Sequence, residues 1–137
     1  MTVEHVSRCV LSRDKIELWS DLCDAYLSAY RLPFRTDHLL LLNGAEFERT
    51  KHVLHKLIAD LNKYVYQTRI YHDPEVFPRL HKMKARAESS YLTGEKLYSG
   101  LSGDIDKPLG EVALNFDQVV SIVHKIILEF LEYHCKE

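Results

Sequence analysis

Residues 45–71 read AEFERTKHVLHKLIADLNKYVYQTRIY, a stretch that contains neither proline nor glycine. As a single helix it would be roughly 40 Å long. Its apolar residues recur at the i, i+3, i+4, i+7 spacing of a helix with one buried stripe. They are Phe47, Leu54, Leu57, Ile58, Leu61, Tyr64 and Val65, continued by Thr68. Other segments must cover such a stripe, so this stretch predicts a helical bundle organised around one long central helix.

Three further segments show helical periodicity. Residues 13–30 form a stripe that ends before Leu32-Pro33, because a residue that precedes proline is pushed out of the α region. A third helix is expected over residues 79–92, between Pro78 and the break at Thr93-Gly94. The last and most apolar helix is expected to open at Asn115, three residues before Gln118, which is the spacing of a capping box. We therefore predict an all-α, single-domain antiparallel bundle of about four to five helices over residues 1–137.

Three segments are harder to interpret. Residues 1–11 are either a short helix or an extended N-terminal arm. Residues 38–42 read HLLLL and fit a helical turn or a buried strand, and the turn is favoured because a lone strand would have no partner. Residues 99–114 are expected to form a flexible surface loop, since glycine is concentrated in their first part.

The composition is that of a folded domain with little net charge. The formal net charge is −2 and the pI is near 6.4, which does not favour nucleic-acid binding by the domain as a whole. No apolar run approaches 18 residues, so no membrane span is expected. The N-terminal residues lack the apolar stretch of a signal peptide. We expect a cytoplasmic protein.

Histidine is abundant, with eight residues, and raises the question of a metal site. His52 and His55 lie three apart in the long helix, and His72 and His81 follow it. Dinuclear sites in helical bundles use Glu-x-x-His pairs, and this chain has none. The three cysteines lack a C-x-x-C pair and are interpreted as buried reduced thiols. We expect neither a metal nor a cofactor.

The alternative hypothesis is that the protein is an enzyme. Arg49 is followed after five residues by His55, and this spacing resembles the Arg–His motif of small helical nucleases of the HEPN class. The resemblance implies a catalytic set of Arg49, His52 and His55 acting on RNA. It departs from the class because the motif there usually lies near the last helix.

A basic segment offers a further alternative. Arg79, Lys82 and Arg86 share one helical face and could neutralise phosphates of a nucleic acid. The competing interpretation is a solvated face that is balanced by acidic neighbours.

Aromatic and apolar residues outside the main stripes favour an interaction surface. Tyrosine and phenylalanine bury much area at small entropic cost, and protein interfaces are enriched in them. The predicted interface residues are Tyr66, Ile70, Tyr71, Phe77 and Leu128. The sequence therefore predicts a non-catalytic helical interaction module whose partner is another protein or a second copy of the chain.

Overall fold

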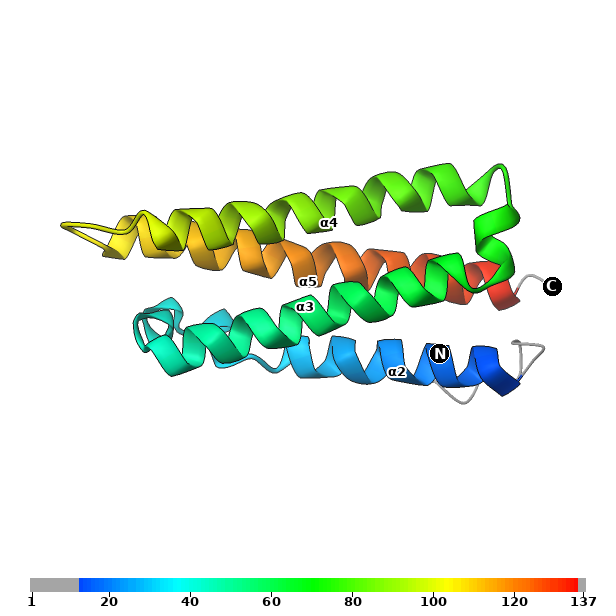
Figure 1. The fold of residues 1–137 in the computed structure, drawn as a ribbon, viewed down its shortest axis with the longest axis horizontal. Helices are drawn as coiled ribbons and strands as arrows, with labels where there is room; N and C mark the ends of the chain where they lie inside the picture. Colours follow the sequence, from blue (N-terminus) through cyan, green and yellow to red (C-terminus); the bar gives the residue numbers. More distant parts are fainter. Residues whose placement is uncertain (1–12, 136–137) are drawn as a thin grey trace.

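The structure, a computed structural model, describes residues 13–135 of the chain and the side chains of residues 16–133. The described residues contain four α-helices: α2 (Arg13–Tyr30), α3 (Gly44–Tyr66), α4 (Val76–Ser99) and α5 (Asp106–Cys135). Three short 3₁₀ helices connect them: η1 (Pro33–Arg35), η2 (His38–Leu42) and η3 (Arg69–His72). Successive α-helices lie side by side and run in opposite directions (Figure 1). The predicted all-α single-domain fold is confirmed, and the predicted arm over residues 1–11 lies outside the described residues.

The helix α3 begins at an asparagine cap and buries the predicted stripe. The Asn43 side chain accepts hydrogen bonds from the backbone N–H groups of Ala45 (2.9 Å) and Glu46 (3.4 Å). These N–H groups have no partner within the helix, so the cap stabilises its first turn. Every strongly apolar position of the stripe is buried except Ile58, which is partly buried.

The predicted length of this helix is corrected by the structure. The helix α3 ends at Tyr66 rather than Tyr71, because Thr68 adopts an extended conformation from which η3 starts. The change of direction carries Ile70 into the core, where it is fully buried. Burial of a whole isoleucine side chain is worth about 1.5–3 kcal/mol, more than the helix propensity lost at the turn. The longest helix is α5, with 30 residues against 23 in α3.

Residues 38–42 form the 3₁₀ helix η2, which confirms the predicted helical turn. The Asp37 side chain caps it by accepting a hydrogen bond from the backbone N–H of Leu39 at 3.0 Å. Only one of its four leucines, Leu41, is buried. Leu39, Leu40 and Leu42 remain exposed at the end of the bundle opposite the α3–α4 connection (Figure 1).

The helix α4 is continuous over 24 residues, whereas the sequence predicted a helix over 79–92 that Gly94 interrupts. Asp73 supports its first turn by accepting hydrogen bonds from the backbone N–H groups of Glu75 (2.9 Å) and Val76 (3.0 Å). Pro78 lies in this first turn, where its missing N–H costs no helical hydrogen bond. Gly94 is accommodated within the helix because α4 packs directly against Phe116 of α5 at this position.

The helix α5 begins at Asp106, which corrects both the predicted start at Asn115 and the predicted loop over 99–114. The connection between α4 and α5 is thus only residues 100–105. Pro108 falls in the first turn of the helix, and the stripe continues upstream through the fully buried Leu109 and Val112. Asn115 lies inside the helix, where its side-chain amide donates to the carbonyl of Glu111 at 2.9 Å.

Two groups of aromatic rings lie along the core. Trp19 of α2 contacts Tyr64 of α3 with ring centroids 5.5 Å apart, and Tyr64 contacts Phe130 of α5 at 4.7 Å. Nearer the other end, the Phe116 ring contacts those of Phe34 and Phe47, each at 6.1 Å. The pair α4–α5 has the most extensive contact, followed by α2–α3. Within residues 13–135, no helix combines the length and apolar character that crossing a bilayer requires.

Candidate functional site

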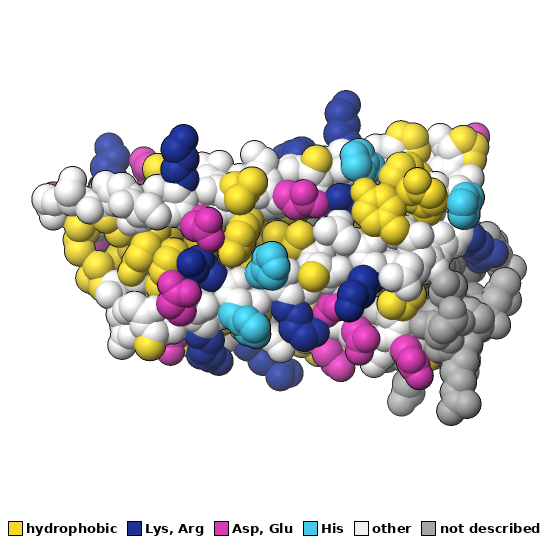
Figure 2. Space-filling model, viewed as in Figure 1, with side chains coloured by type: hydrophobic (Ala, Val, Ile, Leu, Met, Phe, Trp, Pro, Cys, Tyr) yellow, Lys and Arg dark blue, Asp and Glu magenta, His cyan; other side chains and the backbone are white. Residues whose placement is uncertain are grey.

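Three exposed or half-buried aromatic side chains meet where α3 joins α4. The rings of Tyr66 and Tyr71 lie 5.4 Å apart, those of Tyr71 and Phe77 lie 5.0 Å apart, and those of Tyr66 and Phe77 lie 6.0 Å apart. We call these three residues the aromatic cluster. Figure 2 shows hydrophobic side chains gathered at this end of the bundle, with histidines at the edge of the patch. Tyr66 and Tyr71 are 41% and 44% exposed, which is high for rings of this size that already contact one another.

The aromatic cluster is held in place from several sides. Lys84 is almost fully buried, and its Nζ lies 5.4 Å from the centre of the Tyr66 ring while it donates to Glu88 Oε1 at 2.9 Å. His72 and His81 contact the cluster edge, with ring centroids 5.1 Å from Tyr71 and 5.4 Å from Phe77. These contacts hold the rings in one arrangement, which lowers the entropic cost of presenting them to a partner.

Asp73 ties this region to α5. The backbone N–H groups of Val76 and Glu75 stabilise its carboxylate and lower its pKa below the ordinary value. The carboxylate also forms a hydrogen bond with Tyr133, whose pKa is raised by burial and then by the nearby Asp73. The last turns of α5 therefore help to position the start of α4.

Two predicted interface residues lie outside the cluster surface. Ile70 is fully buried and packs within the core, which corrects its predicted place at an exposed interface. Its burial follows from the η3 turn, which the periodicity of the sequence did not show. Leu128 is 50% exposed on α5 and is not part of the aromatic cluster.

A set of polar contacts that the sequence did not predict joins the α2–η2 segment to α5. Arg35 Nε donates to Asp117 Oδ1, and His38 Nε2 lies 3.1 Å from Asp106 Oδ1. A hydrogen bond of 2.7 Å joins Tyr26 Oη and His124 Nδ1. We call these three pairs the polar clasp. The partners are 68 to 98 residues apart, so no local pattern could have revealed them.

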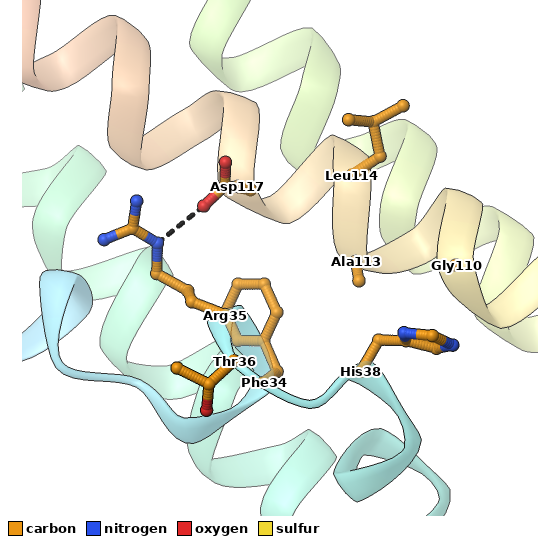
Figure 3. Close-up of a pocket in the computed structure, with 8 residues that line it drawn as sticks. All are labelled: Phe34, Arg35, Thr36, His38, Gly110, Ala113, Leu114 and Asp117. Carbon is orange, nitrogen blue, oxygen red and sulfur yellow. Dashed lines mark hydrogen bonds and ion pairs between the residues drawn. The ribbon is translucent and has the colours of Figure 1, made fainter.

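Two surface grooves lie along the polar clasp. The first has a volume of about 370 Å³, with Phe34, Arg35 and His38 on one wall and Ala113 and Asp117 of α5 on the other (Figure 3). The second, of about 320 Å³, is lined mainly by Tyr26, Tyr30, Val120 and His124. Burial raises the pKa of Tyr26, so its hydroxyl stays protonated near neutral pH. The clasp residues are engaged with one another, and their chemistry is that of a structural contact.

The residues of the predicted nuclease set lie on the exposed surface of α3. The Arg49 guanidinium contacts Glu46 at 3.6 Å, and the His55 ring lies 6.4 Å from that of Tyr91 on α4. His52 is also exposed, and none of the three lines the grooves above. Their catalytic role stays a prediction.

The three basic residues of the predicted nucleic-acid-binding face on α4 differ in their ion pairs. Arg79 forms an ion pair with Glu129 of α5, with Nη2 and Oε2 3.0 Å apart. Lys82 and Arg86 form no ion pair with any described residue. The three residues therefore do not present equal positive charge to a ligand.

Histidine and cysteine are the other residue types that could supply a metal site or a reactive thiol. Within the part of the chain that the structure describes, no three His, Cys, Asp or Glu side chains are grouped so that they could hold a metal ion. Cys23 is buried, and burial, followed by the neighbouring Asp24, raises its pKa to about 12. Its thiol is therefore protonated at neutral pH and packs as a small apolar group.

No protein-family model, curated protein or solved structure matches this chain. Any assignment of function therefore rests on the residues of the chain and their geometry.

Proposed function

We propose that the protein is a non-catalytic helical interaction module that self-associates through the aromatic cluster. The observation that carries the proposal is the mutual contact of Tyr66, Tyr71 and Phe77 at a surface where the two tyrosines remain more than 40% exposed. Clustered aromatic residues at the centre of a surface are typical of the residues that dominate binding energy. Each tyrosine also offers a hydroxyl that can form hydrogen bonds across an interface.

The charges around the cluster favour a second copy of the chain as the partner. Glu75 precedes Phe77 by two residues and Lys82 follows it by five; both side chains are exposed, and neither is in an ion pair with a described residue. A two-fold axis through the cluster would bring the same patch of both copies together. Glu75 of one copy could then face Lys82 of the other, so that one surface supplies both signs of charge. Such pairs at the rim add specificity more than affinity.

The first test is the mass in solution, measured by light scattering at increasing concentration. We expect the wild-type mass to approach twice the 16.0 kDa of one chain. Tyr71→Ser should weaken association by at least about fivefold, since truncating a central aromatic residue of an interface costs more than about 1 kcal/mol. The matched control is Leu92→Ser, which removes a side chain that is 61% exposed on α4 and leaves the cluster intact.

A charge-reversal series tests the two-fold arrangement. Glu75→Lys and Lys82→Glu should each weaken association, and the double variant should restore it because the opposite charges are again paired. A wild-type chain that remains a monomer at all concentrations would refute self-association. A dimer that Tyr71→Ser leaves unchanged would show that the interface lies elsewhere.

A further inference from the structure

A third groove lies between α4 and α5, on residues that the aromatic cluster does not use. Its volume is about 360 Å³. The lining residues are Arg86, Ser89 and Ser90 of α4 and Gln118, Ser121, Ile122 and Lys125 of α5. The antiparallel pairing of the two helices places Ser90 opposite Gln118, and a hydrogen bond of 3.3 Å joins these side chains. Because the helices run in opposite directions, Arg86 and Lys125 both lie to the same side of this pair, about one and two helical turns away from it.

The positive charge of this groove is not neutralised by the neighbouring helices. The carboxylates closest to it in sequence are each bound to another cation: Glu88 to Lys84, Asp117 to Arg35 and Glu129 to Arg79. No carboxylate is among the lining residues. Neither Arg86 nor Lys125 forms an ion pair within residues 16–133. Two like charges that line one groove repel each other, and a bound anion would offset that repulsion.

The remaining lining groups suit an oxygen-rich anion. The hydroxyls of Ser89 and Ser121 can donate hydrogen bonds to a ligand. Ser90 Oγ donates to Gln118 Oε1, which leaves the amide NH₂ of Gln118 as a further donor. A guanidinium can bind a phosphate through two parallel hydrogen bonds, and an ammonium adds a compact charge. We infer that this groove binds the phosphate group of a small phosphate ester, with Arg86 and Lys125 as the principal ligands.

The size and surroundings of the groove favour a small ester over a nucleic acid. The volume falls in the range of small-molecule sites, about 300–1,000 Å³, and is larger than one phosphate group needs. Ile122 offers an apolar contact to the carbon part of an ester. A nucleic-acid backbone requires an extended basic surface, whereas Glu129 neutralises Arg79, about two helical turns before Arg86, and the chain carries a net charge of −2.

The test is a titration of the full chain followed by heteronuclear NMR and calorimetry. The probes are inorganic phosphate, glucose 6-phosphate, unphosphorylated glucose and a single-stranded RNA oligonucleotide. We expect the two phosphate compounds to shift the amide signals of the lining residues and glucose to have no effect. Arg86→Ala and Lys125→Ala should each weaken binding by about tenfold or more, as expected for the loss of a charge-assisted hydrogen bond.

Lys96→Ala is the matched control, because it removes an exposed lysine of the same helix that does not line the groove. It should leave the affinity unchanged. The absence of binding by both phosphate compounds, or binding that Arg86→Ala and Lys125→Ala do not weaken, would overturn the inference. RNA that binds more tightly than glucose 6-phosphate through the same signals would overturn the assignment to a small ester. Repeating the titration with Tyr71→Ser, which should weaken self-association, shows whether phosphate binding is independent of self-association.

Discussion

Replacing Gly94 by alanine tests how closely α4 approaches α5. A Cβ atom at this position would lie 2.6 Å from Cε1 and 2.7 Å from Cδ1 of Phe116. Favourable carbon–carbon contacts are about 3.5–4.0 Å, so the ring or the helix would have to move. The Phe116 ring is fully buried and contacts the rings of Phe34, Phe47 and Tyr91. It cannot move away without displacing these neighbours.

The expected magnitude comes from two opposing effects. Alanine is favoured over glycine inside a helix by about 1 kcal/mol. Overpacking a closely packed core costs about 1–3 kcal/mol. Taking about 2 kcal/mol for the overpacking, Gly94→Ala should destabilise the protein by about 1 kcal/mol. Gly110 of α5 is the matched control, because a Cβ atom there meets nothing within 4 Å. Gly110→Ala should keep the helical gain and stabilise the protein by about 0.5–1 kcal/mol.

Urea unfolding, followed by far-ultraviolet circular dichroism, measures both changes as shifts of the midpoint at constant slope. A double-mutant cycle identifies the cause. Phe116→Leu removes the ring that the new methyl group would meet, so Gly94→Ala should be less destabilising in that background. The reasoning is refuted if Gly94→Ala is as stable as the wild-type protein, or if its cost is the same with and without Phe116.

Two further predictions concern the contacts that position the grooves and the aromatic cluster. Arg35→Ala should lower the unfolding free energy by about 1–2 kcal/mol, because the Arg35–Asp117 hydrogen bond joins η1 to α5. Arg49→Ala is the control, because it breaks only an exposed i, i+3 ion pair and should change the unfolding free energy by less than about 0.5 kcal/mol. Equal losses for the two variants in urea unfolding would contradict the stabilising role of the polar clasp. The lowered pKa of Asp73 means that its ionised form stabilises the fold above about pH 4, and that this stabilisation is lost as pH falls through the lowered pKa. Asp73→Asn keeps an oxygen that can cap the helix but does not titrate, so its unfolding free energy should depend less on pH below about pH 4; identical pH profiles would count against this role.

Features that depend on residues close together in the sequence could be predicted from the sequence. The stripe that begins at Phe47 and the turn at residues 38–42 could both be predicted from the sequence, because each depends on residues within one or two turns. The candidate surface was partly visible for the same reason. Tyr66, Tyr71 and Phe77 are close in sequence, and a short connection between antiparallel helices brings them together.

Periodicity by itself therefore determined that the chain is all-α and which helical faces are apolar. Tertiary packing decided the helix boundaries. The helix α3 ends before Ile70, whose side chain is buried in the core. The helix α4 continues through Gly94, where the missing side chain leaves room for Phe116 of α5. Packing also decided the charges that remain available for binding. Arg79 and Arg86 look equivalent in sequence, but Glu129 of α5 neutralises the first and leaves the second beside Lys125. These outcomes depend on contacts between residues up to 50 positions apart, as for Arg79 and Glu129, and no local pattern encodes such contacts.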